Sequence, residues 1–79
     1  LTALVMRAVV FIHLGENEAA LVDCDRALAI NPKDKQAWLF KGVALNYLGR
    51  YKQCYTSYDR ALGIERRSLG QKLVQMWKG

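Results

Sequence analysis

Residues 25–28 read Asp-Arg-Ala-Leu, and the same four residues return as Asp59-Arg60-Ala61-Leu62. The shift between the two stretches can be extended in either direction without a gap. Between residues 1–34 and 35–68, the other identical pairs at this shift are Ala3 and Ala37, Val9 and Val43, Leu14-Gly15 and Leu48-Gly49, and Ile30 and Ile64. A fixed period of about 34 residues is typical of stacked supersecondary units. The chain is therefore predicted to contain two copies of one unit, at residues 1–34 and 35–68.

Apolar and small residues recur within each unit at the spacing of a helix. A first stripe at residues 4–11 follows the i, i+4, i+7 pattern and stops at Gly15, a residue suited to the left-handed position after a helix. A second stripe at residues 20–28 ends before Pro32, since proline disfavours helix in the residue before it. Both stripes return in the second unit, where Asp34 is the predicted N-cap. Each unit is expected to be an antiparallel pair of helices, because the turns are short.

Small residues occupy matching places in the two units. The three pairs are Ala8 and Gly42, Ala20 and Cys54, and Ala27 and Ala61. Helices approach closely only where side chains are small, so these pairs are predicted to mark the crossing points of each hairpin. A large residue at any of them should overpack the hairpin and cost about 1–3 kcal/mol.

Each unit combines a helix, a turn and a second helix, which gives the chain a clear resemblance to the tetratricopeptide repeat over residues 1–67. The residues that carry the resemblance are Ala8, Ala20, Ala27 and Pro32 in the first unit, and Trp38, Gly42, Tyr51, Tyr58 and Ala61 in the second. The resemblance implies an all-α fold, a tetratricopeptide-like α-solenoid of about five helices. The predicted organisation is a first repeat at 1–34, a second at 35–68 and a C-terminal capping helix at 69–79.

The chain departs from the family pattern at two places. Arg7 and Lys41 replace the leucine that usually precedes the small residue of the first helix, and we expect their aliphatic stems to be buried with the charge at the surface. Arg66 replaces the closing proline of the second unit, which allows residues 64–68 to continue into the following helix. Residues 69–79 are amphipathic, as a capping helix should be. The alternative is a basic helix that lies on a membrane or in the groove of another protein.

Composition excludes several classes of protein. With 52% hydrophobic residues, 24% charged residues and one proline in 79 residues, the chain is neither disordered nor collagen-like. It begins at Leu1, which suggests a piece or a processed product. Residues 1–14 are too short and too interrupted to span a bilayer, and they lack the features of a signal peptide. An intracellular, cytoplasmic protein is therefore expected.

The sequence offers little support for catalysis. It has no glycine-rich phosphate loop, and its one histidine, His13, has no serine or cysteine partner at a motif spacing. Cys24 and Cys54 lack metal-ligand spacing and are expected to be reduced residues of the core. Three aspartates on the second helices are expected to face solvent: Asp23, Asp25 and Asp59. We therefore predict that the protein is not an enzyme and holds no cofactor or metal.

In the family, the first helices of successive units line a concave groove that receives peptides or extended segments. The matching positions here, which the resemblance implies as partner-binding residues, are Val5, Val9, Ile12, His13, Leu39, Val43, Asn46 and Tyr47. Such a groove is mostly apolar, with Asn46, Tyr47 and His13 available to hydrogen-bond a ligand. Val5 and Val9 stand where part of the family's carboxylate clamp would be, so that function is not carried over. The predicted function is a protein interaction scaffold with a protein or peptide partner.

Residues 4–14 are apolar on all sides, and a helix that is apolar all round is normally buried all round. Its own hairpin can cover one side, so a preceding repeat, a peptide or a second copy of the chain must cover the rest. Self-association or contact with neighbouring repeats is therefore expected.

Charge is distributed unevenly along the chain. Residues 1–34 hold three basic and five acidic residues, whereas residues 35–79 hold nine basic and two acidic ones. An alternative function is therefore the binding of nucleic acid or an acidic partner through the second half. Because the basic residues are dispersed over helices, a turn and the predicted cap, nucleic acid is not the expected partner. The same polarity could steer the acidic end of one copy towards the basic end of another.

Overall fold

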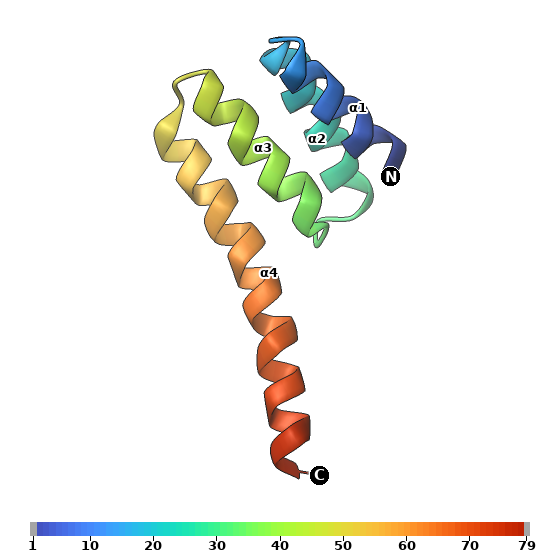
Figure 1. The fold of residues 1–79 in the computed structure, drawn as a ribbon, viewed down its shortest axis with the longest axis vertical. Coiled ribbons are helices and arrows are strands. Elements are labelled where there is room, and N and C mark those ends of the chain that lie inside the picture. Colours follow the sequence, from blue (N-terminus) through green and yellow to red (C-terminus); the bar gives the residue numbers. More distant parts are fainter. Residues whose placement is uncertain (1, 79) are drawn as a thin grey trace.

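The computed structural model describes the backbone of residues 2–78 and the side chains of residues 3–64. Four helices follow one another in this part of the chain: α1 (Thr2–His13), α2 (Asn17–Ile30), α3 (Lys35–Tyr47) and α4 (Tyr51–Lys78). Figure 1 shows two hairpins, α1 with α2 and α3 with the first half of α4. Each helix packs against the next along the chain, and α1 also contacts α3. The predicted all-α fold built from helical hairpins is confirmed.

The number of helices differs from the expected five. α4 runs unbroken through 28 residues and extends well beyond the N-terminal end of α3, so residues 69–78 continue this helix and do not form a separate one (Figure 1). The replacement of the family's closing proline by Arg66 permits this continuation, because arginine keeps the backbone N–H that a continuing helix needs. The capping contact predicted for residues 69–79 lies outside the residues whose side chains are described.

Both hairpin turns depend on a glycine with positive φ. Gly15 has φ of 78° and Gly49 has φ of 77°, in the left-handed region predicted for Gly15. The N–H of Glu16 donates to the carbonyl oxygen of Phe11 at 2.8 Å, and the equivalent bond recurs in the second turn at 2.9 Å. This pattern is the Schellman motif, which satisfies carbonyl groups at a helix C-terminus. The two turns are therefore the same structure built twice.

The connection between the two hairpins is held by two side chains. The carboxylate of Asp34 accepts hydrogen bonds from the backbone N–H groups of Gln36 at 3.0 Å and Ala37 at 3.2 Å, which confirms the predicted N-cap of α3. One turn into the helix, the indole Nε1 of Trp38 donates to the carbonyl oxygen of Pro32 at 2.7 Å. Together these bonds fix the direction in which α3 leaves the loop.

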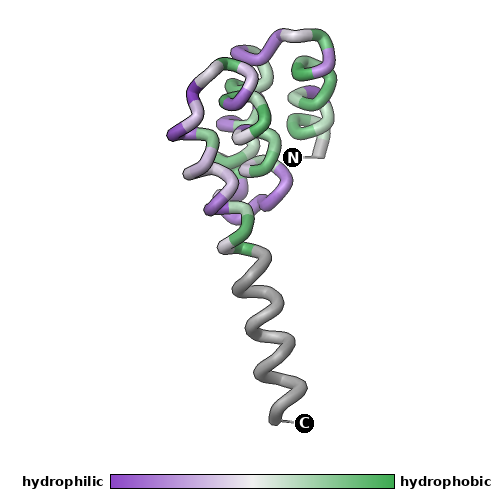
Figure 2. Tube along the Cα trace, turned by 60° about the vertical axis from the view of Figure 1, so that its left-hand side comes forward, coloured by the Kyte–Doolittle hydropathy of each residue, from purple (hydrophilic) through white to green (hydrophobic). Residues whose placement is uncertain are grey.

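Small residues fill the core, as the repeat predicted. The alanine and cysteine members of the three small pairs are all buried: Ala8, Ala20, Ala27, Cys54 and Ala61. Gly42, the remaining member, lies against the ring of Tyr58, and a Cβ atom at Gly42 would stand 2.5 Å from its Cε1 atom. Hydrophobic residues are thus concentrated where the helices meet, whereas the turns are more polar (Figure 2). Close approach of the helices depends on these small side chains.

Both cysteines are free thiols in the core, in agreement with the prediction. Burial raises the pKa of the Cys24 thiol to about 11, and the negative charges of Asp25 and Asp23 add to the effect. Both causes act against the thiolate, which is the reactive form of cysteine. Cys24 is therefore a packing residue that stays protonated at neutral pH.

We expect this thiol to make folding sensitive to alkaline pH. An unfolded thiol ionises near its ordinary pKa of about 9, whereas Cys24 in the folded chain holds its proton up to about 11. The unfolded state thus gains stability first, and the free energy of unfolding should fall by roughly 2–3 kcal/mol as the pH rises from 9 to 11. Urea unfolding at pH 8 and pH 10.5 measures this fall. Cys24→Ala should show a smaller fall, because it lacks this thiol and keeps every other titrating group. An equal fall would contradict the attribution of the pH dependence to Cys24.

Candidate functional site

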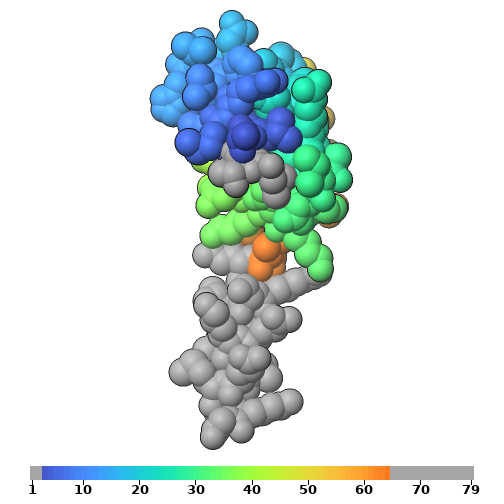
Figure 3. All heavy atoms as spheres, turned by 90° about the vertical axis from the view of Figure 1, so that its right-hand side faces the viewer, coloured from blue at the N-terminus to red at the C-terminus, as the bar shows by residue number. Residues whose placement is uncertain are grey.

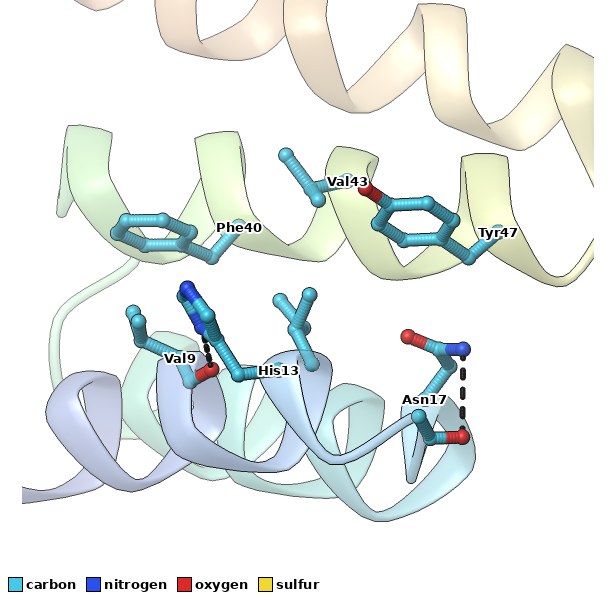
Figure 4. Close-up of a pocket in the computed structure, with 8 residues that line it drawn as sticks. Val9, His13, Asn17, Phe40, Val43 and Tyr47 are labelled. Atoms are coloured by element: carbon cyan, nitrogen blue, oxygen red, sulfur yellow. Dashed lines mark hydrogen bonds between the residues drawn. The ribbon is translucent and has the colours of Figure 1, made fainter.

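A groove with a volume of about 520 Å³ lies between α1 and α3 (Figure 4). Its lining residues are Val9, Ile12, His13, Gly15, Asn17, Phe40, Val43 and Tyr47. α1 and α3 are the first helices of the two units, so the repeat itself places them next to each other. Side chains of Val9, Ile12, Phe40 and Val43 make the groove largely apolar. We refer to this feature as the α1–α3 groove.

Polar groups are found among the lining residues from the turn and from the ends of α1 and α3. The His13 Nδ1 atom donates to the carbonyl oxygen of Val9 at 2.9 Å, which leaves Nε2 as the second polar atom of the ring. Asn17 donates from Nδ2 to the carbonyl oxygen of Gly15 at 3.5 Å, and Tyr47 lies across the groove from it (Figure 4). The Asn17 Oδ1 atom is buried and has no hydrogen-bond donor among the described residues.

Five of the eight predicted partner-binding residues meet in this groove: Val9, Ile12, His13, Val43 and Tyr47. The other three lie elsewhere. Val5 is buried in a cluster with Ala27 and Leu28, so it packs the first hairpin. Leu39 lines a separate depression beside α4, and Asn46 is exposed without lining the groove. The resemblance placed its partner-binding residues on the two helices that line this groove, but it did not anticipate the rotation of each helix about its axis.

Phe40, Gly15 and Asn17 also line the groove but were not predicted. Helical spacing could have identified Phe40, because Phe40, Val43 and Tyr47 are spaced i, i+3, i+7 and share one face of α3. Asn17 begins α2, and it reaches the groove only because the turn at Gly15 places the start of α2 beside the end of α1. No periodic pattern in the sequence signals that position.

An ion pair between Arg7 and Asp23 explains one departure from the family pattern. Arg7 Nε donates to Asp23 Oδ2 at 2.8 Å and Nη2 donates to Oδ1 at 3.0 Å. The Asp23 side chain is 1% exposed, so its expected solvent-facing position was wrong, whereas the Arg7 side chain is 57% exposed. The hydrogen bond and the charge of Asp23 raise the pKa of Arg7 above its ordinary value. Arginine at this position thus neutralises a buried carboxylate.

Two further ion pairs join the first hairpin to the second. Lys41 Nζ lies 2.8 Å from Asp25 Oδ1, and Arg50 Nη2 donates to Glu18 Oε1 at 2.9 Å. The equivalent of Asp23 in the second unit is Ser57, so Lys41 has no acid in its own hairpin at that position. The charge at Lys41 therefore stabilises the α2–α3 junction, whereas the charge at Arg7 stabilises a single hairpin.

The basic surface predicted for the second half is partly occupied in the described part of the chain. Lys41 and Arg50 pair with carboxylates, and the Lys41 and Arg60 charges lie 5.3 Å and 5.4 Å from the centre of the Trp38 ring. Four basic residues of the prediction lie beyond the described side chains: Arg66, Arg67, Lys72 and Lys78. Across the described residues, no helix combines the length and the apolar character needed to cross a membrane.

A helical hairpin that occurs twice in succession, with a groove between the first helices of the two copies, defines an α-helical repeat protein. The family model of the tetratricopeptide repeat matches residues 1–34 and residues 35–68. The chain therefore belongs to the tetratricopeptide repeat family. Proteins of this family are non-enzymatic repeat scaffolds that generally mediate protein–protein interaction.

The relatives range from a protein of similar size to very long chains. An uncharacterized protein of Methanocaldococcus jannaschii is 34% identical over 58 residues, which are 73% of this chain and 67% of that protein. Human tetratricopeptide repeat protein 28 is 34% identical over 70 residues, 89% of this chain but 3% of its own length. Human zinc finger CCCH domain-containing protein 7B is 36% identical over 76 residues, 90% of this chain and 8% of its own length.

Proposed function

We propose that this chain is a non-enzymatic scaffold that binds an extended, largely apolar segment of another protein in the α1–α3 groove. The observation that carries the proposal is the apolar surface of Val9, Ile12, Phe40 and Val43 in a groove of about 520 Å³. Pockets that bind ligands typically have volumes of about 300–1,000 Å³, apolar linings and a few polar groups that fix orientation. His13, Asn17 and Tyr47 provide such polar groups here.

The chemistry of the groove favours recognition over catalysis. Its polar side chains are an imidazole, an amide and a phenol, and none of its lining residues is a serine, cysteine or threonine that His13 could activate. The buried Asn17 Oδ1 atom is a hydrogen-bond acceptor without a donor in the described structure, a state that costs free energy. A backbone N–H of a bound peptide would satisfy this acceptor once the Asn17 side chain turned it toward the groove.

Charge substitution in the groove tests this proposal. A phage-displayed library of random peptides is selected on the wild-type chain, and the enriched peptides are labelled for fluorescence anisotropy. Val43→Glu places a carboxylate among the apolar lining residues and should weaken peptide binding by about tenfold or more. Val22→Glu is the matched control, because Val22 is exposed on α2 and does not line the groove.

Circular dichroism should show equal helicity for the wild type and both glutamate variants. Tyr47→Ala should also weaken binding, because it removes a ring that is exposed at the groove. Selected peptides that bind Val43→Glu as tightly as the wild type would exclude the α1–α3 groove as their site.

Self-association is a second proposed property, and a specific observation favours it. Met6, Val10 and Leu14 form a stripe of large apolar side chains on α1, and all three are exposed. The sequence predicts that such a helix needs cover on every side, and the two described hairpins cover only part of it. By contrast, the described residues give nucleic acid less support, because three basic residues of the second half already contact protein groups: Lys41, Arg50 and Arg60.

A further inference from the structure

The α2–α3 junction shows how one unit of this chain accepts the next. On the first hairpin, Val5, Ala27 and Leu28 belong to one buried cluster, which we call the socket. The residues of α3 that join or pack against this cluster, which we call the plug, are Ala37, Trp38 and Phe40. Contact between the plug and the socket leaves Leu28 only 9% exposed.

A second socket lies at the equivalent positions of the second unit, and it is open. The equivalents of the socket residues are Leu39, Ala61 and Leu62, and they line a depression of about 490 Å³ together with Lys35 and Tyr58. Leu62 is 45% exposed, compared with 9% for its equivalent Leu28. Since α4 continues without a turn to Lys78, no helix within the described residues follows it to cover the depression (Figure 1).

A second plug lies at the other end of the molecule. The equivalents of Ala37, Trp38 and Phe40 are Ala3, Leu4 and Met6 on α1. Met6 is 63% exposed, whereas its equivalent Phe40 is partly buried against the socket cluster. Figure 3 looks onto this side of the molecule and shows the atoms of α1 at the surface. Leu4 already packs against the socket cluster of its own hairpin, so within the described residues Met6 is the large plug residue left exposed, and the Leu39–Ala61–Leu62 socket is open.

The charges around these two faces are complementary at the positions where the chain's own junction has ion pairs. The pair Glu18–Arg50 corresponds, after a shift of one repeat, to Lys52 beside the open socket and Glu16 beside the exposed plug. Both charges are reversed, so the pair remains attractive.

The second ion pair of the junction keeps its signs. Asp25–Lys41 corresponds to Asp59 beside the open socket and Arg7 beside the exposed plug, but Arg7 already donates to the buried Asp23 of its own hairpin. The attractive pair of Lys52 and Glu16 agrees with a contact between these faces, and like charges at these positions would have opposed it.

We propose that copies of this chain associate head to tail, with the Met6 plug of one copy in the Leu39–Ala61–Leu62 socket of the next. The proposal rests on the proposed self-association and assigns the two surfaces that meet. The contact is heterologous, because the two faces differ, so each added copy leaves another plug and another socket exposed. Association therefore continues beyond the dimer, as short filaments or rings. The α1–α3 groove takes no part in the contact.

Two blocked variants test the head-to-tail contact by sedimentation velocity over about 10–500 µM, a range suited to weak interfaces. Met6→Glu blocks the plug and Leu62→Glu blocks the socket. The mean mass of the wild type should rise with concentration, and each variant alone should stay monomeric. An equal mixture should form a dimer and nothing larger, because one intact plug and one intact socket remain. Val22→Glu, on the outside of α2, should associate like the wild type.

Charge reversal provides a second test that leaves both apolar faces intact. Glu16→Lys should weaken association about two- to threefold, as should Lys52→Glu, and the double variant should recover wild-type affinity. Association of Leu62→Glu alone, or a monomeric mixture of the two blocked variants, would overturn the head-to-tail contact but not self-association itself. A wild-type chain that stays monomeric throughout would overturn both, and peptide binding in the groove would be unaffected by either result.

Discussion

Gly42→Ala and Gly63→Ala should change the stability of this protein in opposite directions. Both glycines lie inside helices, α3 and α4, so alanine favours the helix at each position by about 1 kcal/mol. At Gly42 the new Cβ atom would stand 2.5 Å from Cε1 and 2.6 Å from Cδ1 of Tyr58. These atoms are part of a rigid ring that packs between α3 and α4, so relief requires the two helices to move apart.

The overpacking at Gly42 should outweigh the gain in helix propensity. Gly42→Ala is expected to lower the free energy of unfolding by about 1–2 kcal/mol. At Gly63 no described atom lies within 4 Å of the added Cβ, so Gly63→Ala should raise the free energy of unfolding by about 0.5–1 kcal/mol. Urea unfolding monitored by circular dichroism at 222 nm measures both changes. Tyr58→Leu should reduce the cost of Gly42→Ala in a double-mutant cycle; additive effects would show that the ring is not the obstacle.

Removal of Arg7 should destabilise the protein more than removal of Asp23, although the two residues form one ion pair. Arg7→Leu introduces the residue that the family usually has, but it leaves the buried Asp23 carboxylate without its counter-charge. Asp23→Ser introduces the residue found in the second unit, and it leaves an arginine that is 57% exposed and can be hydrated. The burial of each partner, and not its charge, therefore decides the order of the effects.

The double variant completes this test. With Arg7→Leu and Asp23→Ser together, no buried charge remains, so stability should recover to at least the level of Asp23→Ser. Urea midpoints of the four proteins at pH 7 give the comparison, with Arg7→Leu expected to be the lowest. A lower midpoint for Asp23→Ser than for Arg7→Leu would mean that the pair stabilises the fold by direct attraction, and that the buried carboxylate tolerates isolation.

The repeated features of the sequence predicted the fold because each corresponds to a local structure. Gly15 produces the left-handed turn, Asp34 caps α3, and the small residues lie at the crossing points. The fifth helix was wrong because no single residue specifies whether a chain turns or continues. Arg66 permits continuation, and whether the helix stops there depends on the stability of the turn relative to the extended helix.

The candidate site was less predictable than the fold. Val5 and Val9 are both apolar residues of α1, yet Val5 lies in the core and Val9 lines the groove. Their difference depends on how α1 rotates to pack against α2 and α3, which a pattern of apolar positions cannot fix when the helix is apolar on all sides. Asp23 was misplaced for a related reason: its burial depends on a partner sixteen residues earlier, and only tertiary structure shows that pairing.

The packing of each helix against its neighbours along the chain also bears on how fast this protein folds. In the described residues, helices contact their neighbours along the chain, and α1 and α3 are the most distant pair in contact. The ion pairs described above join residues that are 16 to 32 positions apart in the sequence. Because contacting residues are close in the sequence, only short loops must close before native contacts form, and the entropic barrier to folding is low. Topologies of this kind reach the native state in microseconds to milliseconds. Either hairpin can serve as the nucleus, and the other can then form on its surface.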